Sequence, residues 1–303
     1  MGVRLLAFAR MRVSGGRAPV RIVTWAVAVV AALASTDCRS SGGRRANAAR
    51  SGPVTVTGDV VTFPSGARTL HGVVHKPAGT GPFPAILYNH GSAPGMEPAE
   101  AANALGPVFA AHGWLFFMPF RHGQALSADA GPYIMDEIRA AGAGEGRAAT
   151  MVRLLSTDHL DDQLAALAWL RASGRAQPNR IAVAGNSFGG IETVLGAERG
   201  GYCAAIDSAG GAASWAKAPE LRALMTRAVQ NARAPIFFFQ AENDHDLTPS
   251  RVLSAAMRDA GKPFELKIYP RYGSSAEQGH ALGYFGADVW SADVFRFLDA
   301  HCR

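Results

Sequence analysis

The sequence predicts an α/β fold in which a mostly parallel sheet of eight strands is flanked by helices. The first observation is a series of short apolar runs, such as "AILY", "LFFM", "IAVA" and "IFFF", in a chain of 303 residues that is 48% hydrophobic. Strands that are buried on both faces of a parallel sheet have this composition. The second observation is that helical stretches separate the runs, and such an alternation argues for one layered domain.

Eight runs with strand-like composition follow one another from about residue 54 onward. Those in the middle of the chain are nearly all apolar, so we expect them to form the buried part of the sheet. The expected strands are residues 60–63, 70–75, 85–89, 115–119, 181–184, 204–207, 236–240 and 265–269.

Four stretches between and after these strands have helical character. The first has an acid-rich first turn, which suits the helix dipole, and it places Leu160 and Leu164 on one face. The third is amphipathic and is followed by Gly261, a residue type that commonly ends helices. The last has Trp290 and Val294 on one apolar stripe. The expected helices are residues 158–171, 188–199, 249–260 and 287–301.

Residues 123–157 interrupt this alternation. The segment is rich in glycine and alanine, contains Arg139, Arg147 and Arg153, and has weak periodicity. A long excursion within a compact domain is usually functional, so we expect a small cap or loop here. A disordered insertion is the alternative.

The charge of the chain does not indicate a nucleic-acid partner. The net charge is +6, but the first 34 residues contain five arginines and no acid. The basicity therefore belongs to the leader, and the remaining chain makes no strong field for phosphate or for an anionic membrane.

Residues 1–34 are expected to be a signal peptide. Arginines precede the apolar stretch at 22–34, which is too short for a comfortable membrane span and ends in "ALA", a sequence that suits signal peptidase. Because the basic region is long, Met11 is an alternative start. A single membrane anchor is the alternative to cleavage; after cleavage we expect no stable membrane insertion and a secreted or periplasmic protein.

Residues 35–53 are small and polar and are expected to form a flexible linker before a single domain at 54–303. Cys38 suggests a lipoprotein as an alternative, although Asp37 stands where a lipoprotein signal requires a small residue. Cys203 and Cys302 could form a disulfide in an oxidising compartment, or remain unpaired as small apolar residues. The sequence leaves that choice and the oligomeric state open.

The stretch "IAVAGNSFGG" at residues 181–190 contains the pattern G-x-S-x-G between an expected strand and an expected helix. A nucleophile elbow requires this setting, because a tight turn holds Ser187 out at the carboxyl edge of the sheet. Gly185 and Gly189 would relieve clashes with the neighbouring backbone. The N–H of Phe188, at the helix start, could bind a developing oxyanion.

A serine nucleophile requires a base and a group that orients the base. His280, in "SSAEQGHALGYF" after the last strand, is the best candidate base, because His301 lies near the end of the last helix and His245 lies among the candidate acids. The acid is expected in the loop "QAENDHDLTPS". Asp244 is the preferred choice and Asp246 the competitor, with the remaining acids as solvated loop charges or a helix cap.

A second oxyanion donor is expected after the third strand, where the sequence reads "AILYNHGSAPG". Ser92 is placed to offer its N–H, and Gly91 allows the backbone to approach a substrate carbonyl. The walls of the substrate pocket are expected around His90, Gly91, Arg121 and His122.

The motifs "NHGS", "GNSFGG", "AENDHD" and "GH" resemble, in order and spacing, those of the α/β-hydrolase superfamily. Within it, "AENDHDLTPSR" and "LKIYP" make the chain most similar to the dienelactone-hydrolase-like branch, over roughly residues 60–300. The resemblance implies an α/β-hydrolase fold with Ser187 as nucleophile, Asp244 as acid and His280 as base. The amides of Phe188 and Ser92 would form the oxyanion hole.

One departure from that branch affects the expected substrate. Dienelactone hydrolases proper have cysteine at the elbow, whereas this chain has Ser187, which favours a general carboxylesterase acting on small-molecule esters through an acyl-enzyme. Alternatives are a dienelactone-type lactone hydrolase and a serine peptidase of the prolyl-oligopeptidase type. The latter usually needs a gating domain, for which the chain before residue 60 is short. A non-catalytic binding protein on a hydrolase scaffold is the alternative from another class. We expect no cofactor and no metal, since the sequence contains no cysteine cluster.

Overall fold

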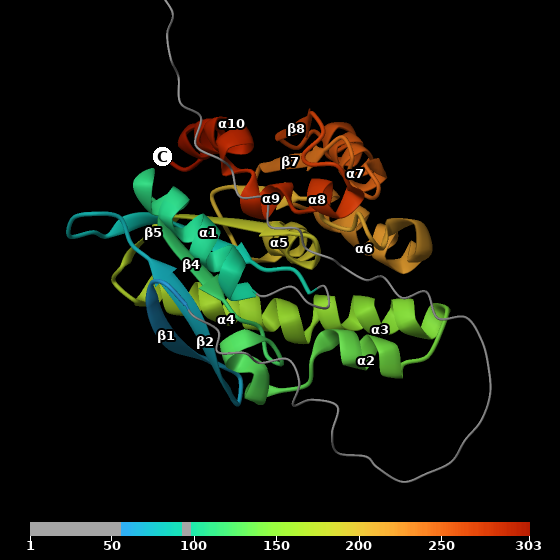
Figure 1. The fold of residues 1–303 in the computed structure, drawn as a ribbon, viewed down its shortest axis with the longest axis horizontal. Helices are drawn as coiled ribbons and strands as arrows, with labels where there is room; N and C mark the ends of the chain where they lie inside the picture. The colour runs from blue at the N-terminus through green and yellow to red at the C-terminus, as the bar shows by residue number, and fades with distance from the viewer. Residues whose placement is uncertain (1–55, 93–97) are drawn as a thin grey trace, which may run out of the picture. The chain divides into compact units, whose positions relative to one another are not determined.

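The eight expected strands are all present and form one sheet in the order β1-β2-β4-β3-β5-β6-β7-β8 (Figure 1). The computed structural model describes residues 56–92 and 98–303. β2 is antiparallel to β1 and to β4, and the other neighbouring strands are parallel. The strands are β1 Asp59–Ser65, β2 Arg68–His75, β3 Phe83–Asn89, β4 Leu115–Pro119, β5 Ala176–Asn186, β6 Ala205–Ser208, β7 Ile236–Ala241 and β8 Phe264–Tyr269.

The register of the parallel strands brings their carboxyl ends to one edge of the sheet. The last residue of β3, Asn89, pairs with Gly185 of β5, and Asn186 pairs with Ser208, the last residue of β6. The loops that follow β3, β5 and β6 therefore emerge side by side. Ligand sites in open α/β sheets lie at this edge.

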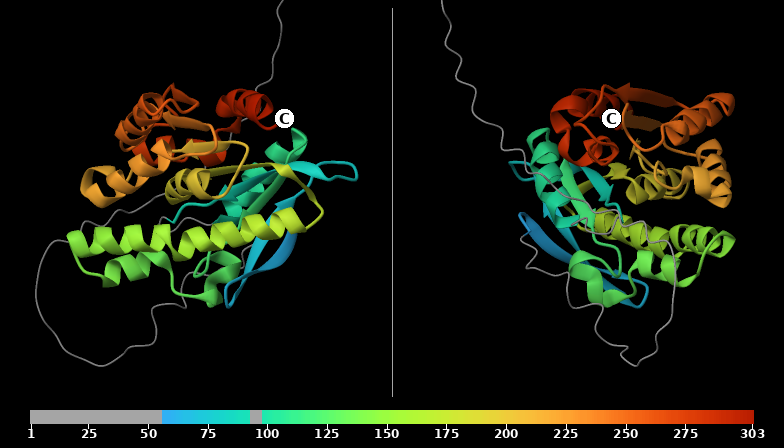
Figure 2. Two further views of the ribbon diagram at one scale, coloured as in Figure 1. Left: turned by 180° about the vertical axis from the view of Figure 1, so that it is seen from behind. Right: turned by 45° about the vertical axis from the view of Figure 1, so that its right-hand side comes forward.

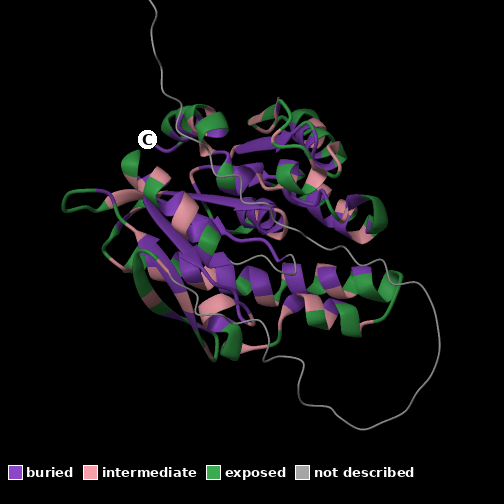
Figure 3. Ribbon diagram, viewed as in Figure 1, coloured by how far each residue is buried: buried purple, intermediate pink, exposed green. Residues whose placement is uncertain are grey.

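Helices cover both faces of the sheet (Figure 2). Alternate residues of a strand point to opposite faces, so Ile86 packs with residues of α1 and α10, whereas Leu87 packs with residues of α4 to α7. The central strands are consequently buried along most or all of their length (Figure 3). The helices are α1 Pro98–Ala111, η1 Ala125–Ala130, α2 Ile134–Ala140, α3 Glu145–Ser156, α4 Asp158–Ala172, α5 Phe188–Arg199, η2 Trp215–Lys217, α6 Pro219–Gln230, α7 Thr248–Asp259, α8 Ala276–His280, α9 Leu282–Phe285 and α10 Ala287–His301.

Residues 123–157 are not an irregular loop or a disordered insertion, because they form η1, α2 and α3. α3 buries Ala148, Met151 and Leu155 against the core, an i, i+3, i+7 stripe that the surrounding glycines and arginines obscured in the sequence. Only Thr157 separates α3 from α4, and the two helices lie almost end to end (Figure 1).

The four expected helices are present as α4, α5, α7 and α10, whereas α1 and α6 were not predicted. α1 is rich in alanine and contains Pro107, so its sequence has little contrast between a polar and an apolar face. No helix within residues 56–92 and 98–303 is long and apolar enough to cross a membrane. The expected signal peptide at 1–34 and the expected linker at 35–53, with Cys38, lie outside the described residues.

Cys203 and Cys302, whose pairing the sequence left open, form a disulfide. Their Cα atoms lie 5.1 Å apart, although 99 positions separate them in the sequence. Cys203 precedes β6 and Cys302 follows α10, so the bond fastens the last helix to the middle of the sheet.

Candidate active site

Ser187 occupies the turn between β5 and α5 with φ 61° and ψ −120°. A positive φ is strained for a residue that carries a Cβ, and such residues cluster at functional sites. Backbone hydrogen bonds hold the residue on both sides: its N–H donates to the Ser208 carbonyl at 3.0 Å, and its carbonyl accepts from Ile191 N–H at 3.1 Å. The sequence therefore forms the strained elbow that the motif predicts.

The flanking glycines are required by close backbone contacts. A Cβ at Gly185 would collide with the backbone of Gly189, and a Cβ at Gly189 would collide with the carbonyl of Asn89. Larger residues here would push α5 away from β3 and β5. The N–H of Phe188 belongs to the first turn of α5, whose amides have no intrahelical acceptor.

His280 and Asp244 are hydrogen-bonded, with 2.8 Å between Nδ1 and the carboxylate Oδ1. The Asp244 side chain is fully buried, whereas 16% of the His280 side chain remains exposed. Asp244 also accepts hydrogen bonds from Gln240 Nε2 at 2.8 Å and from His245 N–H at 2.6 Å. The carboxylate is thus fixed by three donors, while the imidazole stays accessible from the solvent side.

Asp246, the competing acid, lies elsewhere. Its carboxylate accepts the Thr248 N–H at 2.8 Å, at the beginning of α7. The structure therefore brings Asp244, and not Asp246, to His280.

His280 is the last residue of the short helix α8, and not part of an irregular loop as its sequence context suggested. A capping box fixes the start of this helix: Ser275 accepts the Gln278 N–H, and the Gln278 side chain accepts the Ser275 N–H. A defined helix end positions the imidazole more firmly than a free loop would.

Two polar residues that sequence reasoning missed connect the loops of the site. Asn186 Nδ2 donates to the His280 carbonyl at 3.2 Å, and Asn186 Oδ1 accepts from Ser208 Oγ at 2.8 Å. Tyr284 Oη accepts the Gly91 N–H at 2.7 Å and donates to the Asn186 carbonyl at 3.4 Å. Burial raises the pKa of Tyr284 to about 12, so the phenol keeps the proton that it donates.

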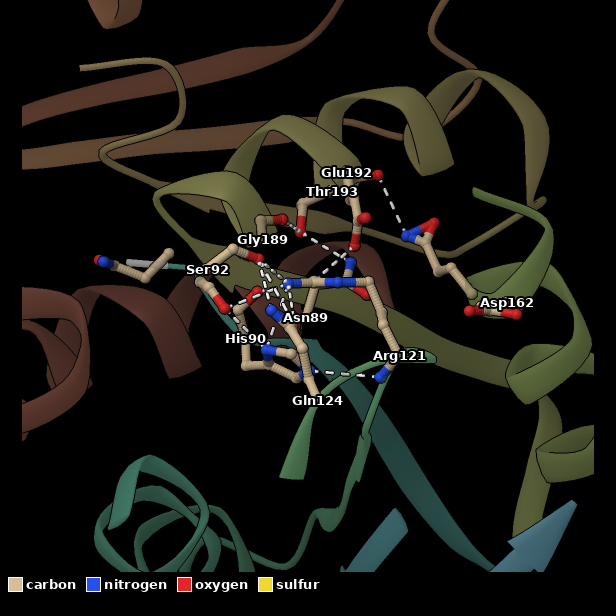
Figure 4. A network of polar contacts seen from close by, with 12 residues as sticks. Asn89, His90, Ser92, Arg121, Gln124, Asp162, Gly189, Glu192 and Thr193 are labelled. Atoms are coloured by element: carbon tan, nitrogen blue, oxygen red, sulfur yellow. Dashed lines mark hydrogen bonds and ion pairs between the residues drawn. The ribbon is translucent and has the colours of Figure 1, made fainter. Parts of the chain in front are cut away.

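The loop after β3 is held from behind by Arg121, which follows β4 (Figure 4). Its guanidinium donates to the carbonyls of His90 at 2.7 Å and Gly91 at 3.1 Å, and to Ser92 Oγ at 2.6 Å. A planar guanidinium with several donors in fixed directions suits this arrangement. The backbone that carries the expected second oxyanion donor is therefore fixed by one buried cation.

The imidazole of His90 is buried and neutral. Burial, and then the charge of Arg121, hold the pKa of His90 well below its usual range. The neutral tautomer that fits its neighbours donates from Nδ1 to the Gly91 carbonyl at 2.7 Å and accepts at Nε2 from Arg121 N–H at 3.3 Å. This tautomer leaves the 3.2 Å contact between Arg121 and Nδ1 as a close approach and not a hydrogen bond.

Glu192 of α5 is the partner of Arg121 at 2.8 Å, and both side chains are buried. Burial raises the pKa of Glu192 to about 7 against the opposing effect of Arg121. His122 is also buried, with Nδ1 hydrogen-bonded to Asp162. The side chains of His90, Arg121 and His122, which the sequence placed in the pocket wall, are all buried, and those of His90 and Arg121 contact the backbone of the loop after β3.

Asp207, at the end of β6, lies against α5 just after the elbow. Its Oδ1 accepts the Gly210 N–H at 2.9 Å, and a Cβ at Gly190 would collide with the same oxygen. Burial raises the pKa of Asp207 from 3.8 to about 7, opposed by the Gly210 hydrogen bond. The folded protein therefore keeps a proton that the unfolded chain releases.

Because the folded protein holds this proton more tightly than the unfolded chain, we expect the Asp207 contribution to the free energy of unfolding to fall as pH rises. Its contribution is fully present below pH 3.8 and is lost as pH rises to about 7, which corresponds to roughly 4 kcal/mol at most. Asp207→Asn cannot ionise, so the variant should lose less stability between pH 4 and pH 8 than the wild type. Urea unfolding at both pH values measures this, and an unchanged difference would exclude Asp207 as its source.

The sheet order, the strained elbow serine and the hydrogen-bonded Asp–His pair at the same sheet edge define an α/β hydrolase. The model of the dienelactone hydrolase family matches residues 70–281, and the chain belongs to this family. No curated protein sequence matches the chain.

Solved structures share the fold at low sequence identity. Acylaminoacyl peptidase from Pyrococcus horikoshii has a TM-score of 0.60 and 18% identity; the match covers 82% of this chain and 42% of the peptidase. Porphyromonas gingivalis dipeptidyl peptidase 4 has a TM-score of 0.57 and 16% identity, over 80% of this chain and 35% of the peptidase. The esterase Est2 from Thermogutta terrifontis has a TM-score of 0.56 and 16% identity, over 80% of this chain and 94% of Est2. This chain thus spans less than half of each peptidase.

Proposed function

We propose that this hydrolase is a serine carboxylesterase with Ser187 as nucleophile, His280 as base and Asp244 as the acid that orients His280. The observation that carries the proposal is the buried Asp244 bonded at 2.8 Å to the partly exposed His280, at the same sheet edge as the strained Ser187. An acid that fixes the tautomer of a base is what a serine nucleophile needs.

In the proposed mechanism, Asp244 accepts a hydrogen bond from the Nδ1–H of His280, which leaves the lone pair of Nε2 free to take the Ser187 proton. Oγ then attacks the ester carbonyl, and the N–H groups of Phe188 and Ser92 bind the oxyanion. His280 returns the proton to the leaving alcohol, and water hydrolyses the acyl-enzyme by the same steps. Arg121, Asn186 and Tyr284 act only by holding these groups in place.

A labelling experiment tests the nucleophile independently of the substrate. A fluorophosphonate probe should label the wild-type protein, and peptide mass spectrometry should find the adduct on Ser187. Labelling should disappear in Ser187→Ala and persist in Ser156→Ala, a serine of α3 outside the site. A folded wild type that resists the probe would favour a non-catalytic scaffold.

The alternative of a serine peptidase is supported by the peptidases among the structures with this fold. The esterase is favoured because the match covers 94% of Est2. A panel of nitrophenyl esters of increasing acyl length, run beside chromogenic peptide substrates, distinguishes the two. Hydrolysis of the peptides at rates comparable to those of the esters would select the peptidase.

We also propose that the protein is exported, with cleavage after Ala34. The basic leader, the short apolar stretch and "ALA" support this, and so does the disulfide between Cys203 and Cys302, because disulfides persist in oxidising compartments. Intact mass and amino-terminal sequencing of protein from an exporting host should give Ser35 as the first residue. Retention of residues 1–34 would indicate an anchor.

A further inference from the structure

A second cluster of ligand-type side chains lies in the core beside the Arg121 loop. His122 follows β4, Glu137 belongs to α2 and His159 belongs to α4. One nitrogen or carboxylate oxygen from each lies within 4.8 Å of the others. The spacing of these residues in the sequence matches no metal motif, which explains why the sequence did not indicate a site.

Several atoms of this cluster lack partners. Within the described part of the chain, neither ring nitrogen of His159 has a hydrogen-bond partner, and the same holds for Oε2 of Glu137. The His159 side chain is fully buried. Buried polar atoms are nearly always paired, so the unpaired atoms of His159 and Glu137 indicate a missing partner.

His122 is prepared to act as a ligand. Its Nδ1 is hydrogen-bonded to Asp162 Oδ2 at 2.5 Å, so Nε2 is the nitrogen that remains for an ion. Asp162 is itself fixed by hydrogen bonds from Ser65 Oγ at 2.6 Å and from the His122 N–H at 3.1 Å. A carboxylate that fixes the tautomer of a histidine in this way is typical of metal sites.

The charges of the surroundings also suit a cation. Glu137 and Asp162 can balance a divalent ion, and Glu192 pairs with Arg121. The rings of His122 and His159 are stacked nearly parallel, with 4.4 Å between centroids, so one ring must tilt for both to bind the same ion.

We propose that His122 Nε2, Glu137 and His159 bind a transition-metal ion of the Zn²⁺ class. Two imidazoles and one carboxylate are the donors that Zn²⁺ prefers, whereas Mg²⁺ and Ca²⁺ prefer oxygen alone. The ion joins α2 to α4 and to the loop that carries Arg121. This site is separate from the proposed Ser187–His280–Asp244 site and does not depend on it.

The test is a Zn²⁺ titration of chelator-treated protein by isothermal calorimetry, with thermal unfolding as a second measurement. The wild type should bind about one equivalent and should unfold at a higher temperature with Zn²⁺ present. Glu137→Gln and His159→Gln should each weaken binding by about 100-fold or more, since even an outer-shell partner contributes up to that factor. No uptake by folded wild-type protein would overturn the proposal.

Matched variants separate this site from other causes. Glu220→Gln and His75→Gln alter groups that also have an unpaired buried atom but lie outside the cluster, and they should bind Zn²⁺ normally. His245→Ala disrupts the other possible group of ligands, Asp244, His245 and His280. Binding lost only in His245→Ala, or unaffected by Glu137→Gln, would assign the ion elsewhere. Because Glu137 is half-buried, its amide variant decides the matter even where His159→Gln does not fold.

Discussion

Replacing Ser187 with alanine is expected to lower ester turnover by about 10³-fold or more while the protein stays folded. The substitution removes only Oγ, and therefore the atom that attacks the carbonyl. The backbone bonds to Ser208 and Ile191 do not involve the side chain, and alanine keeps the Cβ, so the strain at φ 61° is unchanged. Steady-state hydrolysis of a nitrophenyl ester and thermal unfolding of the same preparation measure the two quantities.

Two comparisons make this result specific. Ser156→Ala should leave both rate and stability close to the wild type, because its Oγ only donates to carbonyls within α3. A general loss of structure would instead lower the melting temperature of Ser187→Ala together with its activity. Near-normal turnover by purified Ser187→Ala would reject the serine mechanism.

The strands and the elbow could be predicted because their signals are local. A strand buried on both faces is continuously apolar, and each such run from "AILY" to "IFFF" became a strand of the sheet. The elbow requires glycine where the backbones of β3, β5 and α5 meet, and the sequence has Gly185 and Gly189 at these positions.

The network behind the site could not be predicted because tertiary packing creates it. Glu192 is a charge within an expected helix and would normally face solvent. α5, however, is buried from Gly189 to Ala197 because it is covered on all sides, so this carboxylate meets Arg121 from the loop after β4. Tyr284 likewise follows His280 closely in sequence, but its bond to Gly91 joins segments 193 positions apart.

The helical insertion was missed for a related reason. A helix is predicted from sequence when apolar residues on one face alternate with polar residues on the other. Alanine and glycine are neither strongly apolar nor polar, so a segment rich in them shows little of this periodicity. Ala148 and Met151 of α3 are buried because α4 and α6 cover them, and not because the segment is strongly apolar. The same packing brings Glu137 of α2 close to His159 of α4.

Substituting the two acids of the loop after β7 should have different effects: Asp244→Asn should lower mainly the turnover, and Asp246→Asn mainly the stability. Asp244→Asn places an amide where the carboxylate accepts a hydrogen bond from the Nδ1–H of His280. An amide that donates to Nδ1 favours the wrong imidazole tautomer, which in the worked serine-protease example costs about 10⁴-fold in turnover. Asp246→Asn instead weakens the bond to Thr248 N–H at the start of α7, which should cost at most about 1 kcal/mol of stability and little rate.

Turnover of a nitrophenyl ester and urea unfolding of both variants, measured in parallel, decide between the acids. Gln240 Nε2 donates a hydrogen bond to the Asp244 carboxylate. In Asp244→Asn this bond is lost wherever the NH₂ group of the amide faces Gln240, so we expect a moderate loss of stability beside the large loss of rate. Asp246→Asn should turn over within about twofold of the wild type, since its carboxylate touches no group of the proposed mechanism. The discriminating quantity is therefore turnover, and not stability. A large loss of rate in Asp246→Asn, with Asp244→Asn nearly active, would make Asp246 the working acid and leave Ser187 and His280 in their roles.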